Sequence, residues 1–520
     1  MNEFIQRHRA EVIGALSGFD RLRIRGTLRL LSYVEGMLMY LGLAKVLLKD
    51  FKAYALAATD QIRRATEQLA LAAGRPLHYL PSSRESKEAW ARAVAERDGV
   101  REGLIGVLSC VEPCRSYEIH RNRQAKRLEL RGGPSKCLHY YFYLIHPRWG
   151  FMHLRLQTWF PFTVQVCLNG REWLGRQMDA AGLGYLRREN CFVQVEDAVR
   201  AQKLLDRQLR MHWPRELDRL LAQVHPSHRR IFRAEPVSYY WSVDQSEWAT
   251  DVLFRSPGAL ARLYPQLIQH GIAHLGSREV MRFLGRKLPA HGGVDGRFAG
   301  EVVTDLRERP EGVRIKHRVG ANAIKMYDKQ GSVLRIETTL NDTRDFKVYR
   351  VKEGDEDGPR SWRILRKGLA DLHRRAEVCE QANDRYLSSL ATVEDPTPLG
   401  QLTETLCRPV TWKGRRVRAL NPLSAEDARL LEVVSRGEFA VHGFRNRDVR
   451  PLLFGSTEDA TRERRHAAAT TRRLRLLRAH GLIQKVSKTH RYVLSPKGRT
   501  AITATLAART ANTAELMRAA

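Results

Sequence analysis

The strongest constraint on the fold is an alternation of apolar and charged residues between positions 301 and 340. Turn-forming residues interrupt this alternation at Pro310-Glu311-Gly312, at Gly320 and at Gln330-Gly331. Because successive side chains of a strand point to opposite faces, each segment has one apolar and one charged face. The pattern predicts an antiparallel meander with strands at Glu301–Arg307, Val313–Arg318, Ala323–Asp328 and Val333–Leu340.

The charged face of this meander gathers cations around one tyrosine and one carboxylate, Tyr327 and Glu337. Clustered like charges repel one another unless an anion lies among them, and a nucleic-acid phosphate backbone is such an anion. We therefore expect this face to bind DNA. The expected DNA-binding residues are Arg314, Lys316, Arg318, Lys325, Lys329 and Arg335.

Carboxylates beside these cations are candidate ligands of a divalent metal. Asp305 and Asp328 stand at strand ends, where they could join Glu337 in holding Mg²⁺, the only cofactor that we expect. Tyr327, Glu337 and Asp328 are then the candidate catalytic residues. The alternative is that Glu337 only balances neighbouring cations in surface ion pairs.

The stretch Lys325 to Lys329, followed by Leu334 to Glu337, resembles the paired strands of some plasmid and phage replication initiators. The resemblance implies that the protein nicks DNA with a tyrosine and a metal ion. It does not extend to the His-hydrophobe-His motif of rolling-circle nucleases. The whole chain also resembles a set of uncharacterised bacterial proteins associated with mobile elements.

Two earlier segments bear on the body of the protein. Asp20–Leu31 alternates and predicts a strand with one basic face. Asp20 at its start is either a metal carboxylate or, in the simpler interpretation, a turn or cap residue. Trp248–Phe254 is predicted to be a helix.

The segment Leu423–Arg499 has the spacing of a winged helix-turn-helix. A first helix opens after Ser424, a suitable N-cap, and a second fits Asn446–Leu453. A long helix fits Ser456–His480, and Gly481 ends it. A strand-like stretch up to Leu494 then forms the wing.

This long helix has an apolar side, with Thr470, Leu474 and Leu477 at helical spacing, and an arginine side that suits the major groove. The segment resembles the winged-helix domains of bacterial transcription regulators, which implies duplex DNA binding. The expected DNA-binding residues are Arg465, Arg472, Arg473 and Arg475 on the helix and Lys485, Lys488 and Arg491 on the wing.

Cys137–Phe162 is rich in aromatic residues and predicts a hairpin. On one face Tyr141, Tyr143 and Trp159 alternate with polar residues, a pattern suited to stacking unpaired bases. The alternative is that a helix covers this face.

Apolar residues keep a strict three-four spacing over Trp362–Leu390, with Asn383 at a core position. This pattern indicates a long helix that either pairs two chains into a homodimer or packs on its own domain. The expected domains are therefore 1–210, a mixed α/β domain, 211–350, helices and the meander, 362–392, the long helix, and 423–500, the winged helix.

Composition narrows the partners. The chain has 520 residues and a net charge of +32, so nucleic acid is the first candidate partner and DNA is favoured over RNA. No apolar run is long enough to span a membrane, and no signal-peptide core follows the first residues. Seven scattered cysteines argue against a disulfide framework and indicate the cytoplasm.

The sequence thus predicts a mixed α/β or α+β protein with a C-terminal DNA-binding unit. The leading hypothesis is a DNA-processing enzyme of a mobile element, like a transposase or a replication initiator. One alternative is a large transcription regulator without catalysis. The other is an RNA-binding protein that uses the aromatic sheet face.

Overall fold

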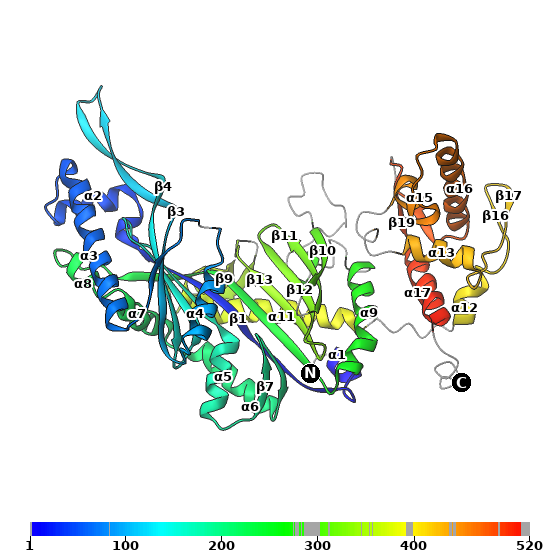
Figure 1. Ribbon diagram of the computed structural model, residues 1–520, viewed down its shortest axis with the longest axis horizontal. Coiled ribbons are helices and arrows are strands. Elements are labelled where there is room, and N and C mark those ends of the chain that lie inside the picture. The colour runs from blue at the N-terminus through cyan, green and yellow to red at the C-terminus, as the bar shows by residue number, and fades with distance from the viewer. Residues whose placement is uncertain are drawn as a thin grey trace.

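The body of the protein is built on one large sheet. The structure, a computed structural model, describes residues 3–510 except 83, 274, 276–279, 282, 285–301, 310–311, 345, 353, 356, 392–398, 436–438, 440–443 and 487–488. The strand order is β10-β11-β12-β13-β9-β1-β6-β5-β4-β3-β2, and every pairing is antiparallel except that of β2 with β3 (Figure 1). The chain is therefore mixed α/β with a mostly antiparallel sheet.

The strands of this sheet are β1 Val12–Leu28, β2 Leu77–Tyr79, β3 Gly103–Asn122, β4 Arg127–His146, β5 Gly150–Gln157, β6 Val164–Asn169, β9 Tyr239–Phe254, β10 Val302–Arg309, β11 Gly312–Val319, β12 Asn322–Lys329 and β13 Val333–Leu340. Two-stranded hairpins are β7 Tyr185–Arg188 with β8 Cys191–Val195, and β14 Lys347–Arg350 with β15 Ser361–Ile364. The body's helices are α1 Glu3–Arg7, α2 Val34–Leu43, α3 Phe51–Ala72, α4 Lys87–Arg97, α5 Gly170–Ala180, α6 Ala198–Leu205, α7 Trp213–Val224, α8 His228–Ile231, α9 Pro257–Ala273 and α11 Leu372–Leu390. Within the described part of the chain, no helix combines the length and the apolar character that a membrane span needs.

The predicted meander is confirmed as β10 to β13, each strand antiparallel to the next. The predicted boundary near residue 210 does not separate two domains, because β1 pairs with β9 along its whole length and β9 pairs with β13. One apolar core runs from Phe4 to Ala391 and joins both halves. The segment Trp248–Phe254 belongs to β9 and is not a helix, since its β-branched and aromatic residues pack between two partner strands.

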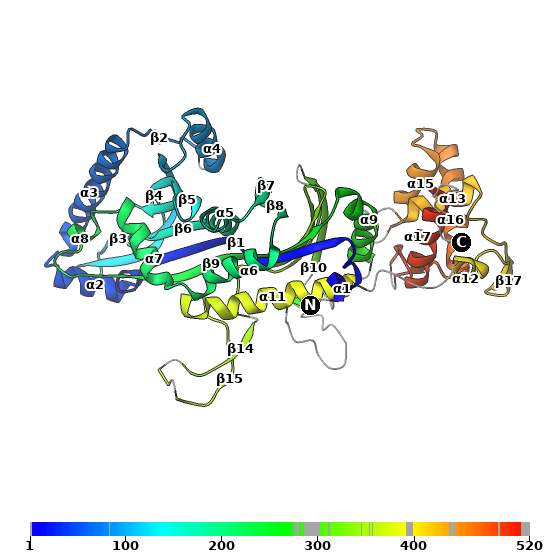
Figure 2. The same ribbon diagram turned by 90° about the horizontal axis from the view of Figure 1, so that it is seen from below.

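The long helix α11 lies against β13, β9 and β1 on one face of the sheet (Figure 2). It begins at Leu372, ten residues later than predicted, because Ser361–Ile364 forms a strand instead. Its apolar spacing faces this sheet: Cys379, Tyr386 and Leu390 are buried within the chain. Of the two alternatives that the spacing left open, the structure shows the helix packed on its own domain.

Asn383 shows how the helix is fixed on the sheet. Its amide nitrogen donates to the carbonyl oxygens of Trp248 and Ile336, at 3.1 and 3.0 Å, and to the Thr250 hydroxyl, at 3.1 Å. The Thr338 hydroxyl donates to its amide oxygen at 2.7 Å. This side chain has no exposed surface, so one amide links the helix to two central strands.

The opposite face of the sheet is covered in part: Arg171 of α5 and Asn190, in the turn between β7 and β8, contact its centre, and α4 covers one end. There α4 packs on β3 and β4, and its residues Ala91 and Val94 form a small core with Leu108, Tyr141 and Tyr143. Figure 2 shows α4 and α11 on opposite sides of the sheet. The remainder of this face carries the polar residues described below.

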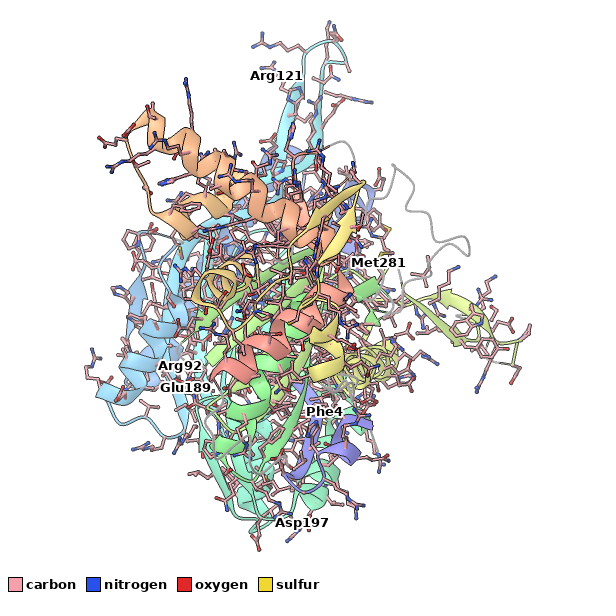
Figure 3. All side chains as sticks on the ribbon, turned by 90° about the vertical axis from the view of Figure 1, so that its right-hand side faces the viewer. Phe4, Arg92, Arg121, Glu189, Asp197 and Met281 are labelled. Atoms are coloured by element: carbon pink, nitrogen blue, oxygen red, sulfur yellow. The ribbon has the colours of Figure 1, made fainter. Side chains whose placement is uncertain are left out.

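Strands β3 and β4 continue past the body as a two-stranded arm (Figure 1). Arg121 lies near its tip, clear of the rest of the molecule (Figure 3). The arm also carries the exposed cations Arg123, Lys126 and Arg127.

The C-terminal unit has a core of its own, from Leu406 to Ile502. Its helices are α12 Leu399–Glu404, α13 Ala425–Val434, α15 Asn446–Phe454, α16 Ala460–Ala479 and α17 Pro496–Thr510, and its hairpins are β16 Val410–Trp412 with β17 Arg415–Val417 and β18 Ile483–Lys485 with β19 Tyr492–Leu494. Ser424 accepts a hydrogen bond from the Asp427 backbone as an N-cap should, and Gly481 has a φ of 72° after α16. The assignment of this unit as a winged helix stays a prediction.

Asn383→Ala tests the attachment of α11. The substitution leaves buried carbonyl and hydroxyl groups without partners, so we expect the free energy of unfolding to fall by about 2–4 kcal/mol in urea titrations. Glu377→Ala, on the exposed side of the same helix, should change it by less than about 0.5 kcal/mol. Equal stability of the two variants would contradict this account.

Candidate functional site

The side of the sheet opposite α11 carries many charged residues and is called the charged face. The following rows of residues define it. Across β10 to β13 the register aligns Asp305, Lys316, Lys325 and Glu337 in one row. The next row aligns Arg314, Tyr327 and Arg335 with Asp251 of β9. On β1 the face continues through Arg21, Arg23 and Arg25, which pair with Asn169, Cys167 and Gln165 of β6.

Three carboxylates converge on this face. Oxygens of Asp20, Glu247 and Glu337 all lie within 4.8 Å of one another. They come from β1, β9 and β13, which are adjacent in the sheet. Asp20 and Glu337 are buried, with 5% and 4% exposure, and Glu247 is partly exposed. This triad could bind a metal ion, because carboxylate oxygens are the ligands that Mg²⁺ and Ca²⁺ prefer.

A β-bulge places Asp20 in the triad. The register of β1 with β9 shifts between Phe19 and Arg21, so Asp20 has no partner residue in β9. The pairing of β1 with β6 begins at Arg21, and α5 starts beside this point. Gly170 allows the close approach of α5, because a Cβ there would lie 1.6 Å from the Phe19 carbonyl oxygen.

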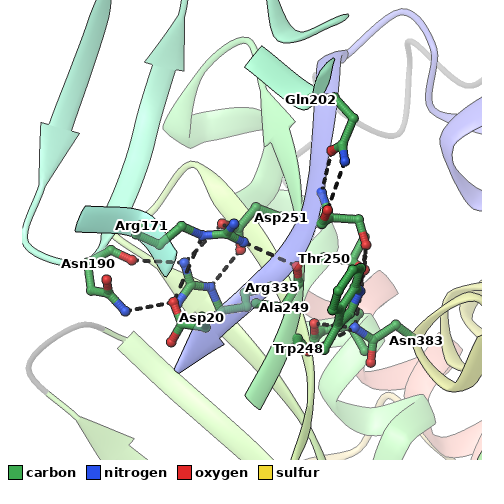
Figure 4. A network of polar contacts seen from close by, with 12 residues as sticks. Asp20, Arg171, Asn190, Gln202, Trp248, Ala249, Thr250, Asp251, Arg335 and Asn383 are labelled. Carbon is green, nitrogen blue, oxygen red and sulfur yellow. Dashed lines mark hydrogen bonds and ion pairs between the residues drawn. The ribbon is translucent and has the colours of Figure 1, made fainter. Parts of the chain in front are cut away.

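A second cluster supports the triad from the neighbouring row (Figure 4). The Arg335 guanidinium donates to both oxygens of Asp251, at 2.6 and 2.9 Å, and to Asp20 at 3.4 Å. Arg171 of α5 lies 2.9 Å from Asp251 and has no exposed surface. Asn190 donates to Asp20 at 2.8 Å. These bonds fix the Asp20 carboxylate between a cation and an amide.

Lys325 is the cation of the triad itself. Its ammonium lies 2.5 Å from Glu337 and 3.6 Å from Glu247, and these two carboxylates raise its pKa above the ordinary lysine range despite burial. Four carboxylates and three buried cations, namely Asp20, Glu247, Asp251 and Glu337 with Lys325, Arg335 and Arg171, form this network.

Glu247 is the carboxylate of the triad whose pKa is altered by its surroundings. Burial and the charge of Glu337 raise its pKa above the ordinary range, although Lys325 and Arg21 act in the opposite direction. Arg21 is 4.0 Å away and its side chain is 46% exposed, so its charge is well screened. The triad therefore favours either a proton or an added cation near Glu247.

Tyr327 lies opposite Arg335 on β12, as the sequence predicted, and shares the face of Glu337. Lys329 Nζ is 5.5 Å from its ring centroid. Burial raises the pKa of the Tyr327 phenol, and Glu337 adds to the effect. The phenol is thus protonated at neutral pH, and it needs a nearby base or cation to act as a nucleophile.

The predicted metal set of Asp305, Asp328 and Glu337 does not converge. Asp328 points to the apolar face of β12, because it alternates with Tyr327 and Lys329. Asp305 lies three strands from Glu337, roughly 14 Å at the ordinary strand spacing, and pairs with Arg314 at 3.0 Å. Glu337 alone remains from that set.

The predicted base-stacking residues are largely covered. Tyr141 and Tyr143 are 8% and 2% exposed beneath α4, and the Tyr141 hydroxyl donates to Glu112 at 2.6 Å. Trp159 packs edge-on against Phe51 of α3. The alternative that a helix covers this face is thus correct for the two tyrosines.

In the C-terminal unit, Thr470, Leu474 and Leu477 are buried as predicted. Arg473 pairs with Glu426 at 2.7 Å and lies over the Phe454 ring, so it stabilises the unit itself. Lys488 lies outside the described residues. Of the other predicted DNA-binding residues here, Arg491 is partly buried and the exposed ones are Arg465, Arg472, Arg475 and Lys485.

Sequence reasoning missed Glu247, Asp251 and Arg171. Glu247 and Asp251 are four residues apart, an even spacing that puts both on one face of a strand. The helix prediction at Trp248–Phe254 concealed this signal. No local pattern marks Arg171, which reaches the site through the packing of α5.

Comparison with known proteins adds no family: no protein-family model, curated protein or solved structure matches this chain.

Metal binding should strengthen with rising pH, because burial and Glu337 raise the pKa of Glu247 and a proton then competes with the cation for this carboxylate. We expect Mn²⁺ to raise the melting temperature by several degrees at about pH 8 and by much less at about pH 5. Without metal the sign is opposite: a raised carboxyl pKa means that stability falls as the pH rises through it.

Charge-removing variants provide the controls. Glu247→Gln and Glu337→Gln should abolish the effect of Mn²⁺ on melting. Asp305→Asn removes a carboxylate of the same face that lies outside the triad. This variant should keep the effect of Mn²⁺ on melting. An equal loss in all three variants would show that the triad is not the binding site.

Proposed function

We propose that the protein is a metal-dependent DNA-processing enzyme that acts on a strand bound across the charged face. One observation carries the proposal: a carboxylate triad with two buried members lies on a face that also carries the cations Arg314, Lys316 and Lys325. Isolated carboxylates repel phosphate, so their place within a phosphate-binding surface is best explained by a metal that bridges the two.

Each part of the face has a distinct role in this proposal. A divalent ion held by Asp20, Glu247 and Glu337 would act as a Lewis acid on a phosphodiester. Arg314 and Lys316, both on β11, would hold flanking phosphates. Burial and the nearby Lys325 charge lower the pKa of Lys316, and the approach of a phosphate would offset that repulsion. Arg335 orients the triad through Asp20 and Asp251.

A non-catalytic binding protein is the second candidate, and Lys325 favours it. Its ammonium already lies 2.5 Å from Glu337, so the triad can also be read as a charge-balanced structural cluster. A large regulator would need only the cations and the C-terminal unit. The RNA-binding alternative loses its main support, because Tyr141 and Tyr143 are covered by α4.

Glu337→Gln separates the two candidates. If the protein is an enzyme, the variant should lose at least about a hundredfold of its Mg²⁺-dependent cleavage of labelled DNA, while its DNA affinity stays equal or rises. Asp305→Asn is the matched control and should retain cleavage. Full activity in a folded Glu337→Gln protein would retire the metal-site proposal.

Tyr327→Phe then identifies the nucleophile. Loss of cleavage together with loss of a covalent protein–DNA adduct would assign attack on phosphorus to the phenolic oxygen. Retained cleavage without any adduct would assign attack to water.

We also propose that the C-terminal unit binds duplex DNA through α16. Arg472→Ala should weaken binding by about 1–3 kcal/mol and relax sequence preference, as expected for a base contact in the major groove. Arg408→Ala, on the segment that follows α12, is the control and should have little effect. Absence of salt-dependent duplex binding by residues 399–510, which enclose a separate core, would refute this assignment.

A further inference from the structure

A cavity opens on the charged face at a distance from the triad. Its volume is about 710 Å³, within the range of small-molecule sites. Its walls come from β1, β6, β5 and β4, from the base of the β3–β4 arm, and from the turn before α2. No role in the proposed cleavage requires it.

Two residues that line this cavity, Ser116 and Arg155, each carry a buried polar atom without a partner in the described chain. The Ser116 hydroxyl and Arg155 Nε have no hydrogen-bond partner in the described chain, and Ser116 is only 7% exposed. An unsatisfied buried polar group costs about 1–3 kcal/mol, so a ligand that bonds to it gains a corresponding advantage. Burial also lowers the pKa of His139 in the wall to about 4, so its imidazole is neutral and adds hydrogen-bonding capacity without charge.

The cavity also has features that suit a phosphate and an aromatic ring. Arg25 and Arg115 line it and are exposed to solvent. Arg25 is held by Asp244 at 2.8 Å and is thereby oriented. Tyr33, which is 51% exposed, offers a ring surface on the same cavity. Exposed cations beside an aromatic ring and a polar interior match the chemistry of a nucleotide.

Strand β1 connects this cavity to the triad. Arg21, Arg23 and Arg25 share one face of the strand, and they lead from Asp20 to the cavity wall. Five residues of strand separate Asp20 from Arg25, a distance of about 17 Å. A single strand that crosses the triad can follow these arginines to the cavity.

We propose that the cavity binds one unpaired nucleotide, with the base inside and its phosphate at Arg25 and Arg115. This inference rests on the proposed function, because the bound strand is taken to run from the triad to the cavity. It adds a base-recognition site to that function. The shared chemistry is a nucleobase joined to a phosphate, whether free or within a strand.

Gly133→Leu tests the proposal by filling the cavity. Gly133 lines the wall on the same side of β4 as His139, and a Cβ there would meet no atom within 4 Å. The full-length variant should bind a labelled single-stranded DNA 12-mer at least tenfold more weakly in EDTA, where cleavage cannot occur. Gly42→Leu, which adds the same side chain at an exposed and equally open position of α2, should bind within twofold of the unaltered protein.

Ser116→Ala provides a second variant that preserves the shape of the cavity. We expect binding to weaken about fivefold, the loss of one hydrogen bond. Titration with the four deoxynucleoside monophosphates shows whether the ligand is a free nucleotide or part of a strand. If these compounds bind and Gly133→Leu abolishes their binding, the ligand is a free nucleotide. If only the 12-mer binds, the ligand is a nucleotide within a strand. Unchanged affinity for all probes in both variants would overturn the proposal.

Glu337→Gln keeps this test separate from that of the proposed function. This variant should bind the 12-mer in EDTA like the unaltered protein even though it does not cleave. Binding at the cavity can therefore be measured even if cleavage is lost. Failure of the cavity test does not change the conclusion about the triad.

Discussion

The pairing of β1 with β9 is the constraint on which the rest of the body depends. These strands are far apart in sequence, and their register runs from Val12 opposite Phe254 to Leu28 opposite Tyr239. This ladder joins the meander to the N-terminal strands in one sheet. It also brings Asp20 to Glu247, and β9 in turn brings both to β13. Without it, neither the triad nor the arginine row of β1 would face the cations of β11 and β12.

One face of the sheet mainly stabilises the fold, and the other carries the candidate site. On the α11 side, apolar residues and the fully bonded Asn383 amide hold the helix in place. On the other side, charges are gathered beyond what stability requires, because buried ion clusters rarely stabilise more than apolar packing of the same volume. Arg335 illustrates the balance: it is 1% exposed, yet its partners Asp251 and Asp20 satisfy it in a fixed geometry. Such preorganisation is more useful to a binding site than to a core.

Lys325 supplies the triad with a cation from the protein itself. With the ammonium beside Glu337, the cluster is nearly balanced and can persist without a metal. A divalent ion would compete with that ammonium and with the proton on Glu247. The affinity of the triad for a metal would therefore be coupled to pH and to the position of one side chain. Because Lys325 can balance the triad without a metal, the same arrangement is compatible with an enzyme and with a binding protein. A cleavage measurement distinguishes the two.

The sequence by itself determined the local elements that follow a clear period. The meander, its turns and its charged face follow from alternation at 301–340, and the helix and buried residues of α16 follow from their spacing. Tyr327 was placed opposite Arg335 for the same reason. These are short-range consequences of side-chain geometry, which a single chain reveals without knowledge of its partners.

Only the tertiary structure decided which carboxylates meet. Asp305 and Asp328 are near Glu337 in sequence. Asp305 lies three strands away from it, and Asp328 points to the opposite face of the sheet. Asp20 and Glu247 are distant in sequence, and a bulge together with the β1–β9 ladder brings them to it. The spacing within Trp362–Leu390 likewise could not show whether its apolar side would meet a second chain or its own sheet. Long-range strand pairing decided the carboxylates, and the packing of α11 on the sheet decided the helix. Both depend on the whole core and leave no local period in the sequence.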